Sequence, residues 1–242
     1  MTCVLCSLAV AAGFAPAANA QEDTAFIEEI VVVSQKREQT LQSLPVAVSV
    51  VSKQQLDEAQ ILDVKDLQFL VPSLRVSTLQ TAANTTFLIR GFGNGANNAG
   101  VEPSVGVFVD GVYRSRTAAS IADLPNLERI EVIKGPQSTL FGKNASAGVI
   151  NIVTAKPSLD GYSGSVSGTV GEYNQVIGKA EVNGPLSDTV AWGLAANFNQ
   201  RDGYFDNLET GNTFNELNRY GLRGQLLWQT GATFEARVIA DY

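Results

Sequence analysis

The last third of the chain alternates between apolar and polar residues. From Tyr162 to Val170, every even-numbered residue is apolar or glycine and every odd-numbered residue is serine or threonine. Further runs with apolar or glycine residues at even positions cover Val176–Val182, Val190–Phe198, Tyr220–Trp228 and Phe234–Tyr242. Successive side chains of a β-strand point to opposite faces, so each run predicts a strand with one apolar face. A series of such strands, each roughly ten residues long, is typical of a transmembrane β-barrel.

The connections between these runs alternate in length. Gly184–Asp188 is short and contains a proline, as expected of a periplasmic turn. Arg201–Asn218 is long and polar and carries aromatic residues, as expected of an outer loop. We therefore expect even-numbered side chains to face acyl chains and odd-numbered ones to face water or another part of the protein. Five strands do not close a barrel, and an open sheet edge in hydrocarbon leaves backbone groups unsatisfied. The chain is therefore expected to be the N-terminal part of a longer protein.

A soluble antiparallel sandwich is the alternative for this region, because its strands alternate in the same way. A sandwich needs a second sheet against which the apolar faces pack. No second sheet is visible in the sequence beyond Gly161. The pattern therefore favours lipid-facing strands.

The preceding region, residues 41–157, has the pattern of a compact α+β unit. A strand is expected over Val46–Val51, and a helix begins at Ser52, where Gln55 completes a capping box. Asp63 is the next N-cap candidate, and Pro72 ends the helix that follows it. Further strands are expected over Thr86–Arg90 and around the Asp110-Gly111 hairpin of Val105–Tyr113.

A glycine-rich turn flanked by two strand-like runs follows, at Leu127–Lys156. Arg129–Lys134 alternates, and Val149–Thr154 is rich in β-branched residues. Because the second run also carries Asn151 and Thr154, we expect it to lie between two wet or polar surfaces. This stretch resembles the end of the plug domain of TonB-dependent outer-membrane receptors. The resemblance is carried by Arg129, Glu131, Val132, Lys134, Gly135, Pro136, Leu140, Phe141, Gly142, Gly148, Val149, Ile150, Asn151 and Ile152.

The resemblance implies an α+β plug domain followed by antiparallel transmembrane β-barrel strands, here an incomplete barrel. Met1–Ala20 has the apolar stretch and the small-residue cleavage site of a secretory signal, although no Lys or Arg precedes that stretch. The expected order is a signal peptide at 1–20, a periplasmic leader at 21–40, the plug at 41–157 and the first barrel strands at 158–242.

The polar leader contains one apolar island with high β propensity. Such a segment suits strand addition to the sheet edge of another protein. By resemblance it is the TonB box, which binds TonB, the energy-coupling protein of the inner membrane; the alternative is a plug strand docked within this chain. The expected TonB-binding residues are Glu29, Ile30, Val31, Val32 and Val33.

Plug loops that face outward are implied to help contact the ligand. The loop Gly91–Glu102 is rich in Gly and Asn, but it has neither the Lys-Ser/Thr of a P-loop nor the third glycine of a dinucleotide fingerprint. Two arginines follow the hairpin, and they either bind an anionic ligand or pair with acidic residues of the barrel wall; we favour the pairing. The candidate ligand-facing residues are Phe92, Asn94, Asn97, Asn98, Arg114 and Arg116.

Composition excludes several other classes. A net charge of −7 argues against a nucleic-acid partner. The chain has no histidine, and its two cysteines, Cys3 and Cys6, lie in the expected signal, so we predict no enzyme, no cofactor and no metal site. The resemblance implies energised uptake of a bulky ligand, by default a ferric siderophore, across the outer membrane of a Gram-negative bacterium, with the plug and leader on the periplasmic and luminal side. The alternative is a passive porin or a structural barrel.

Overall fold

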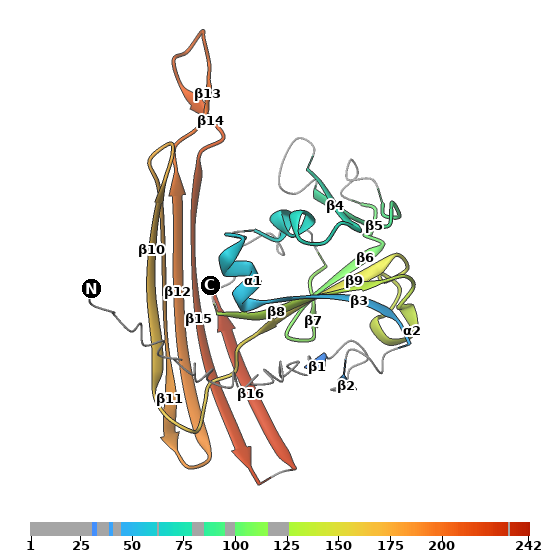
Figure 1. Cartoon of the computed structure of the whole chain (residues 1–242), viewed down its shortest axis with the longest axis vertical. Helices are drawn as coiled ribbons and strands as arrows, with labels where there is room; N and C mark the ends of the chain where they lie inside the picture. Colours follow the sequence, from blue (N-terminus) through green and yellow to red (C-terminus); the bar gives the residue numbers. More distant parts are fainter. Residues whose placement is uncertain are drawn as a thin grey trace, which may run out of the picture.

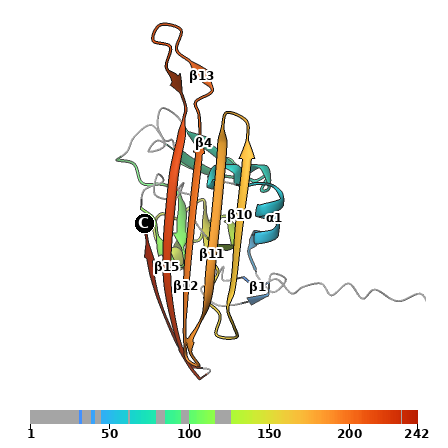
Figure 2. The same cartoon turned by 90° about the vertical axis from the view of Figure 1, so that its left-hand side faces the viewer.

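Two units make up the described part of the chain, an open sheet of long strands and a smaller α+β unit packed against one of its faces (Figure 1). The computed structural model describes residues 31–32, 39–40, 45–61, 63–78, 85–94, 100–115, 126–231 and 233–242. Seen from its other face, the open sheet has its strands side by side and the α+β unit behind them (Figure 2). Near the start of the chain, β1 (Val31–Val32) pairs antiparallel with β2 (Gln39–Thr40).

The α+β unit is built on a five-stranded sheet. Its spatial order is β3-β8-β9-β6-β7, and β9 runs parallel to β6 while the other neighbours are antiparallel. All five residues of β6 are buried, which explains its continuous apolar sequence. The strands are β3 (Ala47–Ser52), β6 (Val105–Val109), β7 (Val112–Tyr113), β8 (Leu127–Lys134) and β9 (Gly148–Thr154).

Short helices cover this sheet where their N-caps were predicted. Helix α1 (Lys53–Glu58) begins after Ser52, which forms the expected capping box with Gln55. The segment after Asp63 is a 3-10 helix, η2 (Val64–Phe69), which has its own capping box between Asp63 and Asp66. Their buried side chains Leu56, Val64 and Leu67 pack into the main core with Ile130, Val132, Ile150 and Ile152 of the sheet.

A second hairpin and a short helix complete the unit. Strand β4 (Leu74–Thr78) pairs with β5 (Thr85–Ile89), and α2 (Ser138–Phe141) follows β8. The turn between β6 and β7 has positive φ at Asp110 (48°) and Gly111 (80°), which confirms the predicted Asp-Gly hairpin.

The long strands form one antiparallel sheet, called here the strand wall. Its order is β10-β11-β12-β15-β16, and each strand pairs with the next wall strand along the chain. The long connection expected after Arg201 projects beyond the wall and contains the small hairpin of β13 (Phe205–Asp206) and β14 (Thr213–Phe214). The wall consists of β10 (Ser163–Gly171), β11 (Gln175–Ser187), β12 (Val190–Arg201), β15 (Leu217–Thr230) and β16 (Phe234–Asp241).

The predicted alternation of the wall is confirmed. Every antiparallel pairing joins even residues to even ones, except at the bulge near Pro185, so one parity holds for each face of the sheet. The large hydrophobic side chains exposed on the strands are even-numbered: Val166, Val170, Val176, Val182, Leu194, Phe198, Tyr220, Leu222, Leu226, Trp228, Phe234 and Val238, with Leu186 at the end of β11. The buried side chains of the wall, hydrophobic and polar alike, are odd-numbered and lie on the face toward the α+β unit: Ile177, Ala191, Ala195, Asn197, Asn199, Arg223, Gln225 and Leu227.

The turn predicted at Gly184–Asp188 is shorter than expected. Strand β11 continues through Pro185 to Ser187, and Asp188 and Thr189 alone form the turn. A register shift between Pro185 and Ser187 allows this extension. A bulge is one of the few places in a sheet that tolerates a residue without an N–H group.

No helix in the described ranges is long and apolar enough to cross a membrane.

Candidate functional site at the seam between the two units

Asp110 is the centre of the contact between the α+β unit and the strand wall. The β6–β7 turn presents its carboxylate to the end of β9, where Oδ1 accepts from the Thr154 backbone N–H (2.9 Å) and Oδ2 accepts from Thr154 Oγ1 (2.8 Å). From the wall, Arg223 Nη1 donates to Oδ2 at 2.8 Å, and Arg237 Nη1 lies 3.5 Å from Oδ1. A turn residue of the α+β unit therefore joins two arginines of the wall.

The two arginines are themselves held in place by further partners. Arg223 also donates to Thr154 Oγ1 (2.6 Å), and its Nε lies 2.7 Å from Oδ1 of Asp241 on the neighbouring strand. Arg237 donates to Thr154 Oγ1 (2.8 Å) and to Gln225 Oε1 (2.9 Å). We call Asp110, Thr154, Arg223 and Arg237 the Asp110 network.

The Asp110 network is buried. The side chain of Arg223 is 1% exposed and that of Asp110 is 8% exposed. A charge at such a site is tolerated because it is paired, and removing one partner leaves the other uncompensated in a medium of low polarity. The network therefore holds the α+β unit against β15 and β16 in one defined position.

The other side of the seam is built differently. Between α1 and η2 on one side and β10, β11 and β12 on the other lies a cavity of about 570 Å³. Two ion pairs cross it, Lys53 to Glu181 (2.8 Å) and Lys179 to Asp57 (3.9 Å), and the Lys53 and Asp57 side chains are 48% and 57% exposed. Solvent screens such pairs, so each stabilises the contact by about 1 kcal/mol at most.

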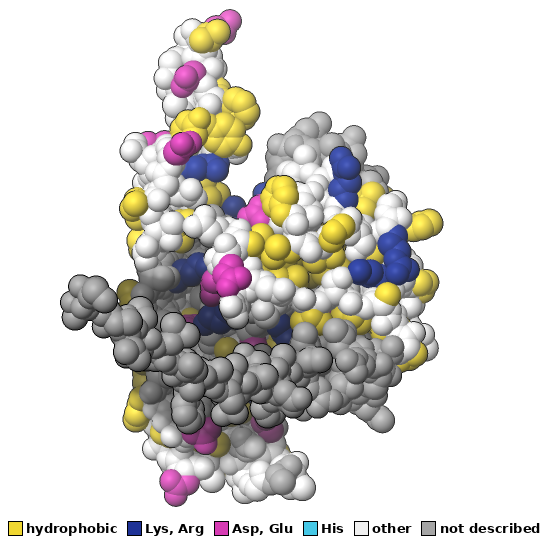
Figure 3. All heavy atoms as spheres, viewed as in Figure 1, with side chains coloured by type: hydrophobic (Ala, Val, Ile, Leu, Met, Phe, Trp, Pro, Cys, Tyr) yellow, Lys and Arg dark blue, Asp and Glu magenta, His cyan; other side chains and the backbone are white. Residues whose placement is uncertain are grey.

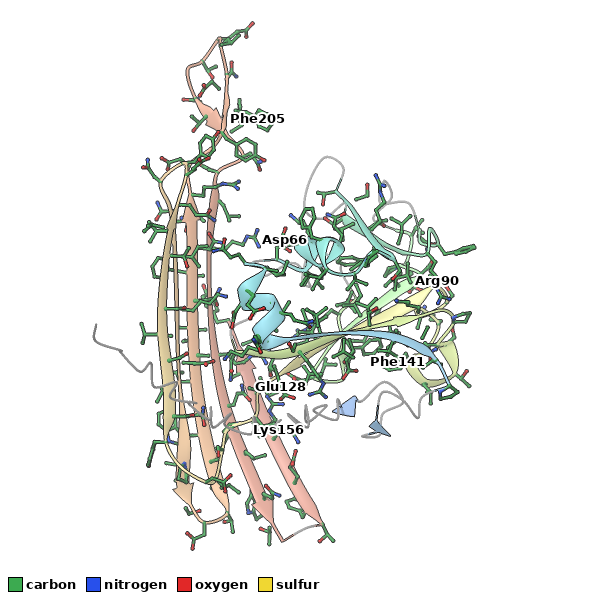
Figure 4. The ribbon with its side chains drawn as sticks, viewed as in Figure 1. Asp66, Arg90, Glu128, Phe141, Lys156 and Phe205 are labelled. Atoms are coloured by element: carbon green, nitrogen blue, oxygen red, sulfur yellow. The ribbon has the colours of Figure 1, made fainter. Side chains whose placement is uncertain are left out.

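The labelled side chains show which parts of the α+β unit meet the wall (Figure 4). Asp66 and Glu128 lie on the side that faces the strands, Lys156 lies in the connection to them, and Arg90 and Phe141 lie on the far side. Phe205 lies at the base of the projecting loop, on the side of the wall that faces the α+β unit.

The polar residues of β9 have partners inside the protein, so of the two expected surroundings, wet or polar, the structure shows polar ones. The strand is flanked by β8 and β6 at the centre of the sheet and is almost wholly buried. Asn151 donates to the fully buried Glu131 (3.0 Å), which also pairs with Arg129 (2.9 Å). Buried polar groups require such partners, and a neighbouring strand supplies them as well as water does.

The candidate ligand-facing residues differ in whether their side chains already have partners within the protein. Phe92 is 73% exposed, next to the end of β5. Asn94 is engaged, because its side chain bonds to the carbonyl of Glu102 and to the hydroxyl of Ser104. Arg114 pairs with Asp241 of the wall at 3.4 Å, which is the structural pairing favoured from the sequence. The remaining candidates, Asn97, Asn98 and Arg116, lie outside the described residues.

Of the expected TonB-binding residues, the structure describes Val31 and Val32 only, as β1. Their strand pairs with β2, so that Val31 lies opposite Thr40 and Val32 opposite Gln39. Glu29, Ile30 and Val33 lie outside the described residues. In the described part of the chain, no three His, Cys, Asp or Glu side chains come together in a way that suits a metal ion.

The sequence did not identify the Asp110 network. The Asp-Gly pattern predicts a turn at Asp110 and nothing more, and the alternation predicts Arg223 and Arg237 on the polar, odd-numbered face. A hairpin aspartate and a strand arginine 113 residues apart share no local pattern. The one sequence feature that pointed to this network was the group of arginines on a strand face expected to meet water or another part of the protein.

Comparison with known proteins defines the class. Residues 40–149 match the family described as TonB-dependent Receptor Plug Domain. The iron-regulated outer membrane virulence protein of Vibrio cholerae is 34% identical over 217 residues, and the vitamin B12 transporter BtuB of Vibrio vulnificus is 31% identical over 188 residues. These matches cover 81% and 73% of this chain, and 31% and 28% of the two relatives.

Among solved structures, the chain is similar to the ferric yersiniabactin uptake receptor FyuA from Yersinia pestis. The TM-score is 0.74 at 26% identity, over 81% of this chain and 31% of that one. The chain thus spans about a third of the length of the proteins that it matches. Through its plug domain the chain belongs to the TonB-dependent receptor family. The predicted fold class, a plug followed by antiparallel strands of an incomplete barrel, is confirmed.

Proposed function

We propose that this chain is the N-terminal part of a receptor that takes up a ferric siderophore, driven by TonB. The observation that carries the proposal is the docking of a plug-family domain on the polar face of the strand wall. A domain fixed there fills a lumen that is otherwise too wide to select its cargo. The iron-regulated relative and the ferric yersiniabactin receptor support iron as the cargo. The names of the matched relatives give no support to a passive porin.

The proposal requires additional strands. The wall has five strands, and its outer strands β10 and β16 each leave one edge unpaired in the described structure. Backbone groups of a lipid-exposed edge have no partner in hydrocarbon, so the remaining edges are closed by further strands of the same barrel. The proposed organisation remains a signal at 1–20, a leader at 21–40, a plug at 41–157 and barrel strands from 158.

We place the TonB contact at Glu29–Val33. Its centre is already extended in β1, and the pairing with β2 uses one edge of that strand. The opposite edge, or the edge released when β2 separates, suits the addition of a strand from TonB through backbone hydrogen bonds. Proline has no backbone N–H and therefore interrupts such pairing.

The first experiment tests TonB dependence in the complete receptor. A strain without its own receptor is supplied with the wild-type or the Val31→Pro receptor, and uptake of radioactive iron is measured with a panel of ferric siderophores. Val31→Pro is expected to abolish uptake. The matched control Val31→Thr keeps the N–H and the β-branched shape and is expected to retain uptake.

The receptor level in the outer membrane is measured for each variant. Unchanged uptake by Val31→Pro at normal receptor level would contradict the TonB assignment. Uptake that persists after the proton gradient is dissipated would contradict energised transport. Uptake of cobalamin and of none of the iron chelates would contradict the ferric siderophore as cargo but would leave TonB-driven uptake standing.

For ligand contact we propose Phe92, together with Asn97, Asn98 and Arg116 of the neighbouring loops. An exposed aromatic ring next to an outward loop offers a binding surface at low cost in conformational entropy. Asn94 and Arg114 are proposed to support the loop and the seam, because their side chains already have partners.

A further inference from the structure

The arginines of the strand wall form a single row on its inner face. From Tyr162 onward the sequence contains four arginines, Arg201, Arg219, Arg223 and Arg237, and all are odd-numbered. Arg201 pairs in register with Leu217, and Arg237 with Leu227, so along β15 the four lie level with residues 217, 219, 223 and 227. At about 3.3 Å per residue the row extends over about 33 Å. Figure 3 shows basic side chains along the seam, from the base of the projecting loop downward.

The counter-ions of this row are carried largely by the plug. Asp63, the N-cap of η2, pairs with Arg219 at 3.0 Å. Asp110 pairs with Arg223 at 2.8 Å and with Arg237 at 3.5 Å. On the wall itself, between the levels of residues 217 and 227 on β15 and β16, the sole acidic side chain is Asp241. Other acidic residues of the wall lie off the row, Glu181 on β11 and Glu235 beyond Arg237.

Arg201, at the outer end of the row, has no carboxylate partner within the described residues. Its Nη2 donates to the Asn215 carbonyl (3.0 Å), its guanidinium lies 4.8 Å from the centre of the Tyr204 ring, and its Nε is buried without a hydrogen-bond partner. An anion that arrives from the projecting loop therefore meets an arginine that has no carboxylate partner in the described part of the chain.

We propose that this row is a track for an anionic ligand, and that Asp63 and Asp110 occupy it as placeholders while the plug is in place. The proposal rests on the function proposed above. When the plug moves, it removes both carboxylates, and Arg219, Arg223 and Arg237 keep Asp241 as their one carboxylate on the wall, which leaves a net charge of about +2. A guanidinium presents a planar fork of donors that fits a carboxylate, so a ligand rich in carboxylates takes the positions that the plug leaves.

Pore block by citrate tests the track without knowledge of the natural ligand. The complete receptor is placed in planar lipid bilayers, urea is added until the plug is released and current flows, and citrate is then titrated with metal chelated by EDTA. The Arg219→Gln, Arg223→Gln, Arg237→Gln variant is expected to bind citrate about tenfold more weakly than the wild type, because three partly solvated ion pairs are lost. The control Arg75→Gln removes the same kind of charge from the exposed β4 strand of the plug and is expected to change nothing.

If the triple variant does not insert, Arg219→Gln alone is measured, because this partly exposed arginine is not a member of the buried network. Its expected effect is about threefold. Equal citrate block in the wild type and in the inserted variant would overturn the track while leaving the receptor function intact. A wild-type receptor that conducts at the same level with and without urea would overturn the proposed function itself, because no plug would then close the pore.

Discussion

The plug meets the strand wall in two regions that differ in the solvation of their charges. Against β15 and β16, the Asp110 network is buried and each of its charges has several partners. Against β10, β11 and β12, α1 faces the wall across a cavity, and exposed pairs such as Lys53–Glu181 and Lys179–Asp57 span it. The two regions have a similar number of ion pairs. Water screens the exposed pairs against β10, β11 and β12, and it does not screen the buried pairs against β15 and β16.

The difference indicates which part of the plug can move. The chain enters the plug sheet at β3, which is an edge strand and is followed directly by α1. The pull by TonB proposed above would therefore act first on the weakly held region. The firmly held region, at the far edge of the sheet, carries β6 and the Asp110 turn. Movement of α1 is therefore expected first, and the contacts of Asp63 and Asp110 with the arginine row are expected to separate later.

The largest expected effect comes from tethering the mobile region. In the receptor with Lys53→Cys and Glu181→Cys, a short bis-maleimide joins α1 to β11, and uptake of the ferric ligand is expected to stop completely. The same reagent on Lys156→Cys and Glu235→Cys, an ion pair of 2.6 Å whose lysine is about as exposed as Lys53, joins the chain to β16 beside the firmly held region. This control is expected to keep most of its uptake.

Both cysteine pairs are measured before and after the reagent, so that each variant is its own reference. Equal loss of uptake from the two tethers would show that the connection beside β16 has to move as much as α1 does, and the inferred order of release would be wrong. Full uptake with a verified Lys53–Glu181 tether would show that the ligand takes another route.

The next effect in size is the loss of one charge from the buried region. Asp110→Asn keeps the side-chain size and the tolerance for positive φ, so the hairpin turn is preserved. It leaves Arg223 and Arg237 buried without their plug counter-ion, and docking of the plug is expected to weaken by about 3–5 kcal/mol. The measurement is the urea midpoint at which trypsin begins to cleave the plug of the intact receptor. A midpoint unchanged from wild type would mean that the network does not hold the plug.

Features that depend on residues close in the chain could be predicted from the sequence. The parity of the strands, the capping box of Ser52 and Gln55 and the Asp110-Gly111 turn all depend on residues close in the chain, and the structure confirms them. Local chemistry also placed Arg223 on the inner face, since a strand alternates strictly. The extension of β11 through Pro185 was missed, because a bulge depends on the partner strand.

The partners of buried polar residues could not be predicted in this way. Asn151 and Thr154 predict wet or polar surroundings but not which groups supply them: one meets Glu131 of the adjacent strand and the other meets Asp110 and two arginines of the wall. Such contacts depend on how the plug docks, and docking is decided by the whole arrangement of charges. The sequence therefore predicted the elements well and the seam poorly.

Thr154 offers a smaller change within the buried region. Its hydroxyl donates to Asp110 and accepts from Arg223 and Arg237, and valine has nearly the same shape without the hydroxyl. Thr154→Val is expected to lower the stability of plug docking by about 1–3 kcal/mol, measured by the same urea midpoint. Thr154→Ser keeps the hydroxyl and is expected to retain most of that stability. Equal midpoints for the valine and serine variants would show that packing, and not hydrogen bonding, explains the loss.

The smallest effect is expected on the exposed side, at Asp57. Its carboxylate lies 3.9 Å from Lys179 and is 57% exposed, so water already compensates both charges. Asp57→Asn is expected to shift the urea midpoint by no more than about 1 kcal/mol, and the shift is expected to vanish at high salt. Asp57→Asn and Asp110→Asn are the same chemical change on the two sides of one domain, so their difference measures the combined effect of burial and of the additional partners of Asp110. A loss at Asp57 as large as that at Asp110, and insensitive to salt, would mean that the cavity is closed to solvent in the receptor and that both regions hold the plug equally.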